Sequence, residues 1–340
     1  MWRETTRHAR NLRIFREELD GWLPARILDF HVHVFNPATL RGRRTWSCAG
    51  HPIRKYGFAE LRRDLAELYP GRRTAAVCFG FPDRAYDLAA NNRYVAAGAD
   101  GRRFLALRLL DPYEDPEAVR RELASGRFLG VKPYLNYVRG KPVNDIEIPD
   151  MLPDWAMRIL DDLGQIVLLH IPRKARLADP VNQEQLVELC RRWPRARIVL
   201  AHVGRAYYLK CALGNLERLK RLPNLWYDLA MVSNPEVLEH VFATVPPDKL
   251  LYATDMPISV APGKSVEVND QYSYITPAPW ELSIHDTSGK IVYTSFVYEE
   301  LRGISKAVER LGLGGKFLRG VFFENGMRLL RSVQPDGKEQ

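Results

Sequence analysis

Several features that direct a chain to a membrane, an export route or a disulfide-bonded fold are missing from this sequence. It has no apolar run of membrane-spanning length, and its basic N-terminus lacks the apolar core of a signal peptide. Glu17, Glu18 and Asp20 are also atypical of a transit peptide. Only four cysteines occur, none with CxxC spacing: Cys48, Cys78, Cys190 and Cys211. These absences predict a cytoplasmic protein with reduced thiols and no membrane partner.

A concentrated basic stripe is missing as well, although the formal net charge is +9, from 50 Lys and Arg against 41 Asp and Glu. The arginines occur mostly as scattered doublets beside acidic residues, as on the solvated faces of helices. Nucleic acid binding would need a basic stripe with interleaved aromatic residues. We therefore expect no nucleic acid partner and a small anionic substrate, which the positive field would attract.

The middle of the chain repeats one pattern, a short apolar run followed by an amphipathic stretch. The apolar runs are almost continuous, as expected for parallel strands that are buried on both faces. There are eight such runs: Ile27–Phe35, Thr74–Phe81, Phe104–Leu110, Phe128–Leu135, Gln165–Ile171, Arg197–Val203, Leu225–Val232 and Leu250–Thr254.

Amphipathic segments between these runs have apolar residues at helical spacing. They predict helices at Phe58–Tyr69, Asp154–Leu163, Gln183–Trp193, Asn215–Leu222 and Pro235–Thr244. Eight strand-then-helix units predict a (β/α)₈ TIM barrel. A doubly wound open sheet is the alternative, but it would use a glycine-rich turn after the first strand, which is missing here.

The sequence predicts a helical extension over residues 1–26, a barrel over residues 27–331 and a flexible tail over residues 332–340. Long loops follow the first strand (residues 36–57) and the eighth strand (residues 258–296). Within the second loop, Ser265–Tyr274 and Ile291–Val297 are expected to pair as strands. Loops after strand ends surround the active site of a barrel, so both are candidates for a lid.

Two histidines stand at the end of the first apolar run, at His31 and His33. Because side chains alternate along a strand, both point to the same face, which is the interior in a barrel. Two imidazoles placed in this way can chelate one metal ion. Two buried, hydrogen-bonded histidines would give the same pattern, so the pair alone does not decide.

Three other apolar runs end with one metal-competent group each: His170, His202 and Asp255. A buried polar group without a partner is costly, so each of these residues needs a reason for its position. Convergence of the strand ends at one mouth supplies that reason. Imidazole nitrogens with one carboxylate oxygen suit one divalent ion, Zn²⁺ first, with Mn²⁺ or Fe²⁺ as alternatives.

With these five residues in this order, the chain resembles the amidohydrolase superfamily. The segment at residues 322–330 also resembles the amidohydrolase-related branch (amidohydrolase family 2), which includes decarboxylases of the aminocarboxymuconate-semialdehyde type and several lactonases. The resemblance implies that His31, His33, His170 and Asp255 bind one metal ion. It also implies that Asp255 and His202 are catalytic and transfer protons.

The resemblance gives Lys132, at the end of the fourth run, two interpretations. In two-metal members of the superfamily a lysine there is carbamylated and bridges the metals, whereas this branch usually holds one metal. We therefore expect Lys132 to bind substrate or to act through its positive charge. Tyr134, Arg173 and Arg205 lie near the same mouth, where an arginine could bind a carboxylate through two hydrogen bonds or instead pair with nearby acids.

The predicted activity is metal-dependent hydrolysis of a lactone, ester or amide bond in a small, carboxylated compound. The alternative is a metal-dependent decarboxylase of a small unsaturated or aromatic carboxylic acid, which would use the same ligands. A barrel that only binds a ligand is a third interpretation, disfavoured by the full ligand set. The sequence leaves a homo-oligomer open.

Overall fold

The computed structural model describes residues 9–42 and 46–333 and has a mixed α/β fold. Its largest sheet has six parallel strands in the order β11-β10-β9-β8-β7-β6. A second parallel sheet has the order β1-β4-β5. These strands are β1 (Arg26–His33), β4 (Arg73–Phe79), β5 (Phe104–Ala106), β6 (Arg108–Leu110), β7 (Gly130–Pro133), β8 (Ile166–Leu169), β9 (Arg197–Leu200), β10 (Leu225–Asp228) and β11 (Leu250–Leu251).

Backbone hydrogen bonds link the two parallel sheets at both edges. At one edge β5 and β6 are separated by Leu107 alone, whose N–H donates to the carbonyl of Cys78 in β4. At the other edge the segment after β11 lies beside β1, where His33 N donates to Met256 O (2.8 Å) and Asp255 N donates to His31 O (2.9 Å). Each of the eight predicted apolar runs therefore contains a strand, and the third run contains two.

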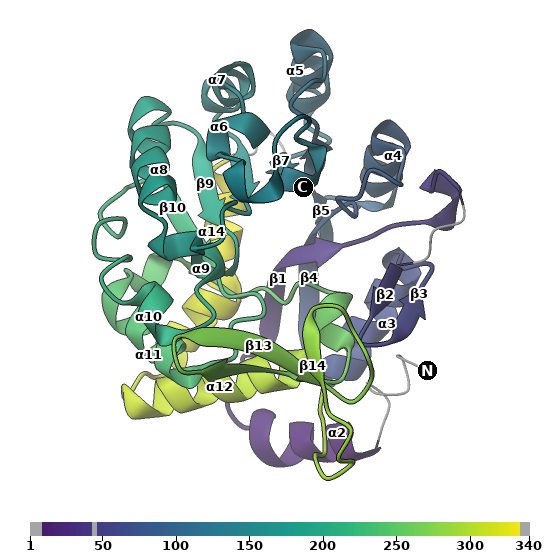
Figure 1. Cartoon of the computed structure of the whole chain (residues 1–340), viewed down its shortest axis with the longest axis vertical. Helices are drawn as coiled ribbons and strands as arrows, with labels where there is room; N and C mark the ends of the chain where they lie inside the picture. Colours follow the sequence, from purple (N-terminus) through teal and green to yellow (C-terminus); the bar gives the residue numbers. More distant parts are fainter. Residues whose placement is uncertain (1–8, 43–45, 334–340) are drawn as a thin grey trace.

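Helices lie around the outside of the parallel strands (Figure 1). Several begin at a side chain that accepts hydrogen bonds from the first turn, among them Asp87, Asp179, Asn234 and Ser295. The longer helices are α3 (Phe58–Leu68), α4 (Leu88–Gly98), α5 (Pro116–Ala124), α7 (Asp154–Leu163), α8 (Pro180–Arg192), α11 (Pro235–Thr244) and α12 (Phe296–Arg310). Shorter ones are α2 (Ala9–Ile14), α6 (Ile148–Met151), α9 (His202–Arg205), α10 (Leu209–Ala212), α13 (Gly315–Arg319) and α14 (Asn325–Arg331).

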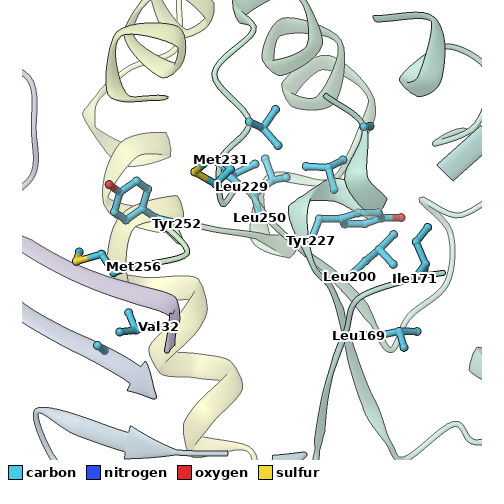
Figure 2. Packing of buried hydrophobic residues seen from close by; sticks show 14 of the residues in the cluster. Val32, Leu169, Ile171, Leu200, Tyr227, Leu229, Met231, Leu250, Tyr252 and Met256 are labelled. Carbon is cyan, nitrogen blue, oxygen red and sulfur yellow. The ribbon is translucent and has the colours of Figure 1, made fainter. Parts of the chain in front are cut away.

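The hydrophobic core lies between the strands and these helices. Figure 2 shows part of it, where side chains from β1, β8, β9, β10 and β11 and from the segments that follow them pack together. Leu169, Leu200 and Tyr252 are almost completely buried there. The strand ends that carry the polar groups of the site are thus held by close-packed apolar neighbours.

The loop after β1 forms a two-stranded hairpin, β2 (Trp46–Cys48) with β3 (His51–Ile53). The segment after β11 forms a small sheet in the order β12-β13-β14, with β12 (Lys264–Val268), β13 (Gln271–Thr276) and β14 (Ser283–His285). We call residues 264–285 the lid sheet. The predicted strand Ser265–Tyr274 is therefore a hairpin with its turn between β12 and β13.

Two sequence-based predictions were wrong. Ile291–Val297 forms no strand, because Ser295 caps the N-terminus of α12. Asn215–Leu222 forms a series of turns rather than a helix, with i→i+3 bonds from Leu219 N to Leu216 O and from Leu222 N to Leu219 O. Its buried leucines gave the helical spacing, but a run this short, ended by Pro223, can bury them from turns.

The described part of the N-terminal extension is helical. After α2 the chain continues as a π-helical turn at Phe15–Leu19, whose Phe15 and Leu19 are buried. Glu18 forms an ion pair with Arg302 on α12. Residues 1–8 of the predicted extension and residues 334–340 of the predicted tail lie outside the described residues. No helix in the described ranges combines the length and apolarity needed to cross a membrane.

Candidate metal centre

His31 and His33 lie at the end of β1, and both rings are oriented by hydrogen bonds at Nδ1. His31 Nδ1 lies 2.9 Å from Asp228 Oδ2, and His33 Nδ1 lies 3.0 Å from the carbonyl oxygen of Gly80. A carbonyl oxygen only accepts, so His33 carries its proton on Nδ1, and the carboxylate of Asp228 selects the same tautomer of His31. Burial also lowers the pKa of His31 well below its ordinary value. In its neutral form each ring therefore presents an unprotonated Nε2 atom.

Asp255 lies where these two Nε2 atoms converge. Its Oδ1 is 3.1 Å from His33 Nε2 and 3.5 Å from His31 Nε2. Burial alone would raise the pKa of Asp255, but positive charge on the neighbouring histidines, His31 first, lowers it below its ordinary value, so the carboxylate is ionised. Two imidazole lone pairs and a carboxylate oxygen at one point repel each other unless a cation or a proton lies between them. This donor set fits a divalent metal ion.

Asp228, which the sequence reasoning missed, ends β10 and connects two histidines. It is fully buried, and its Oδ1 accepts hydrogen bonds from His202 N (2.7 Å) and Ala230 N (3.2 Å) while its Oδ2 orients His31. His202 Nδ1 in turn lies 2.9 Å from Ala230 O, which leaves its Nε2 unprotonated. Burial lowers the pKa of His202, so the ring is neutral.

His170 follows β8 and stands on the wall beside this group. Its ring centroid is 5.5 Å from that of His202 and 4.8 Å from that of Tyr134. Its Nδ1 is buried and has no hydrogen-bond partner among the described residues. The ligand atoms of His31, His33 and Asp255 lie within 4.8 Å of one another, and His170 is outside that group. Three of the four predicted ligands are thus brought together directly.

Asp29 has a different place from the metal-competent residues. It is fully buried, and it accepts hydrogen bonds from Thr254 Oγ1 (2.5 Å), Thr254 N (3.0 Å) and His31 N (3.1 Å). Burial raises its pKa to about 7 despite these bonds. Asp29 therefore fixes the backbone of β1 to the segment that carries Asp255.

Lys132 lies near the end of β7 and is completely buried. Its Nζ has no hydrogen-bond partner within the described ranges, and it lies 5.3 Å from the ring centroid of Phe79 and 5.8 Å from that of Tyr134. Burial lowers the pKa of Lys132 to about 8 and raises the pKa of Tyr134 to about 12. Lys132 thus supplies positive potential to the site.

The histidines and Asp255 line a cavity of about 510 Å³. Its lining includes Tyr134, Asn136, Arg205 and the histidines, and the lid sheet contributes Tyr272, Ser273 and Tyr274. Trp280 covers Tyr274, with ring planes 11° apart. Further aromatic walls come from Trp46, Phe81 and Tyr207. The long segment after β11 thus lies over the mouth of the cavity, and the hairpin after β1 contributes Trp46.

The structure separates the arginines that the sequence placed near the mouth. Arg205 lines the cavity, and its Nη1 donates to the carbonyl oxygens of Ile171 (3.2 Å) and Arg173 (3.3 Å). Arg173 does not line the cavity, and its Nε donates to Asp179 at 2.9 Å. Arg176, which the sequence reasoning missed, does line it. The spacing of arginines in the sequence carried no signal that distinguishes these three.

Comparison with known proteins adds a family and a set of similar folds. The family model described as Amidohydrolase (Amidohydro_2) matches residues 28–275. No curated protein sequence matches the chain. Among solved structures, Amidohydrolase 2 from Bifidobacterium longum subsp. infantis is 14% identical with a TM-score of 0.58, over 91% of this chain and 99% of that chain.

Two further similar structures belong to proteins that are named for an activity. A probable 2-pyrone-4,6-dicarboxylic acid hydrolase from Acinetobacter baumannii, with citric acid bound, is 15% identical with a TM-score of 0.54, over 90% of this chain and 99% of that chain. The 5-carboxyvanillate decarboxylase from Sphingomonas paucimobilis is 14% identical with a TM-score of 0.52, over 91% of this chain and 99% of that chain. At these identities the likeness concerns the fold alone.

Proposed function

The chain belongs to the amidohydrolase family, and on this premise we propose that it is a metal-dependent hydrolase. Its substrate is a lactone, ester or amide of a small carboxylated compound. The observation that carries this proposal is the convergence of His31 Nε2, His33 Nε2 and the ionised Asp255 Oδ1 at one buried point. That point faces a cavity large enough for a small molecule.

We further propose that the eight strand positions form one closed barrel within residues 27–331. The backbone bonds across both sheet edges support this arrangement, because β1 is flanked by β4 on one side and by the segment after β11 on the other. In a barrel the metal-competent groups stand at the carboxyl ends of the strands, where barrel enzymes have their active sites.

One metal ion, zinc by the chemistry of its donors, would be held by His31, His33 and Asp255, with His170 as the fourth ligand. When bound, such an ion polarises a carbonyl oxygen and makes water a stronger acid. Lys132 keeps an electrostatic or substrate-binding role. The four cysteines, all free and buried, support a reducing compartment.

The residues of the chain would then move the protons. His202 is neutral, and its Nε2 accepts a proton from the attacking water. Asp255 orients that water through its second carboxylate oxygen. The water oxygen bonds to the carbonyl carbon, the bond to the leaving oxygen or nitrogen breaks, and His202 returns its proton to the leaving group.

Substrate binding is assigned to Tyr134, Arg205 and Lys132. Tyr134 keeps its proton because its pKa is raised to about 12, so it can donate to a substrate oxygen. Arg205 is held by two backbone carbonyls and still reaches the cavity. Arg173 is left out of the proposal, because Asp179 binds it away from the cavity.

Decarboxylation is the second candidate, and one observation favours it. The cavity is walled by Trp46, Phe81 and Tyr207, and apolar walls strip water from a departing carboxylate. A decarboxylase therefore fits the same centre. The hydrolase is preferred, since His202 already provides the proton transfers of hydrolysis and Asp255 orients the water, and no described residue is placed as a dedicated acid for a carbon atom.

To test the two activities, zinc-loaded protein is incubated with sugar-acid lactones and simple esters, and separately with aromatic and unsaturated carboxylic acids. Acid release is followed in the first set and CO₂ in the second. We expect acid release that is lost in Asp255→Asn. CO₂ release with every lactone and ester intact would replace the hydrolase by the decarboxylase, and turnover of neither set would remove both.

A further inference from the structure

The loop that follows β8 is fastened to the start of α8. Asn182 is fully buried, and its Nδ2 donates to Pro172 O and Arg176 O, each at 2.9 Å. Asp179 caps the helix and binds Arg173. These contacts fix the backbone of the loop, and Arg173 contributes to them through its ion pair with Asp179. A fixed loop presents its next arginine, Arg176, without a further ordering cost.

Arg176 itself has no such internal partner. Its backbone is left-handed, with φ of 57°. Its Nε is buried and lacks a hydrogen-bond partner among residues 9–42 and 46–333. Within the same ranges no carboxylate lies within ion-pairing distance of its guanidinium, in contrast to Arg173. An arginine that lines a cavity with an unused buried donor is suited to an anion that enters from the cavity.

The lid sheet supplies an aromatic ring that contacts Arg176 in the cavity. The Arg176 guanidinium lies 4.4 Å from the ring centroid of Tyr272 on β13. Tyr272 is backed by Tyr207, with ring centroids 4.6 Å apart, and by the nearly parallel ring of Tyr208. The aromatic face holds the cation through its quadrupole and leaves the edge nitrogens of the guanidinium for a ligand.

We infer that Arg176 and Tyr272 form a subsite for a second anionic group of the substrate, remote from the group that reacts at the metal centre. This inference rests on the proposed function only in taking the cavity as the substrate site. Arg205 is less suited to this task, because its Nη1 already donates to two backbone carbonyls. The preferred substrates would therefore carry two anionic groups, with the second recognised jointly by the loop after β8 and by the lid sheet.

The test is calorimetric titration of zinc-loaded protein, without turnover, using ligands matched in frame. Isophthalate and benzoate form one pair, and glutarate and butyrate another. We expect the wild type to bind the dianion of at least one pair more tightly than its monoanion. Arg176→Gln should weaken dianion binding about 10- to 100-fold, the loss of one charge-assisted hydrogen-bonded contact, and leave the monoanion unchanged.

Two variants sharpen the outcome. Lys174→Gln removes an exposed positive charge two residues away, outside the cavity lining, and should keep the discrimination, whereas Arg176→Lys keeps the charge and should restore part of it. The subsite is refuted if the wild type binds no dianion better than its monoanion, or if Arg176→Gln leaves that preference intact. It is also refuted if Arg176→Gln only makes the lid sheet easier to cleave by protease. Because no catalysis is measured, a failed hydrolase assay leaves this result standing.

Discussion

Replacing Asp228 by Asn is the sharpest probe of the metal centre. The amide oxygen can still accept from His202 N and Ala230 N, as Asp228 Oδ1 does. The amide NH₂ would then stand at the position of Oδ2, 2.9 Å from His31 Nδ1. Two N–H groups cannot face each other, so His31 is driven to carry its proton on Nε2. The atom that should bind the metal is then blocked.

The size of the effect follows from what the substitution preserves. Losing the carboxylate that orients a metal-binding histidine typically lowers metal affinity 10- to 100-fold, or about 1.4–2.8 kcal/mol. The two hydrogen bonds from backbone N–H groups remain, because the amide oxygen of the substituted side chain accepts them. The free energy of unfolding of the metal-free protein should therefore change by only about 1 kcal/mol. The prediction is a variant that folds and binds zinc weakly.

Competition with a chromophoric chelator measures the zinc affinity, and thermal unfolding of chelator-treated protein measures stability. Glu281→Gln is the matched control, because it removes one carboxylate from the mouth of the same cavity and should leave zinc affinity within about twofold. Zinc affinity of Asp228→Asn equal to the wild type would refute the tautomer argument. If zinc affinity fell by the same factor in Glu281→Gln, the loss in Asp228→Asn would reflect only the removal of a negative charge and not a change of the His31 tautomer.

Three other predictions concern the metal ion, the lid sheet and the buried Glu300. Chelator-treated protein should unfold several degrees lower than zinc-loaded protein, with about one zinc per wild-type chain by elemental analysis and none in His31→Ala. Replacing residues 264–285 by a short linker should weaken substrate affinity while zinc content stays unchanged; unchanged kinetics would exclude a lid. Burial raises the pKa of Glu300 well above its ordinary value, so its contribution to stability is present while it is protonated at low pH and is lost as pH rises. The neutral Glu300→Gln still accepts from Met231 N, so its urea midpoint should gain on the wild type from pH 5 to pH 8, and a constant difference would contradict this.

The strand positions were predictable because buried parallel strands have a distinctive composition. All eight apolar runs hold a strand, since few other elements make short, almost continuous Val, Ile and Leu segments. The helices were less predictable where the apolar stripe was short. Leu216 and Leu219 are buried from turns, and α4 has buried Asn91 and Asn92 on its inner face, which weakens the apolar pattern.

The metal-competent residues were predictable at the strand ends, where a polar group after an apolar run needs a partner. The same signal was present for Asp228 in the run Leu225–Val232 and was overlooked, because the aspartate stands inside that run rather than at its end. The strand stops at Asp228, and the four apolar residues after it belong to a buried loop. A polar residue inside an apolar run can therefore mark the end of a strand, just as a polar residue at the end of such a run can.

The arginines of the loop after β8 show what sequence spacing cannot carry. Arg173 and Arg176 both have positive φ, and both stand within six residues of His170, so their chemistry and their distance from the metal-competent histidine are nearly the same. What separates them is Asp179, which caps α8 and binds Arg173 with the same Oδ1 atom. A helix cap therefore decides which arginine is bound internally and which remains free to face the cavity. Because that choice depends on where α8 begins and on the direction of each side chain, it exists only in the folded chain.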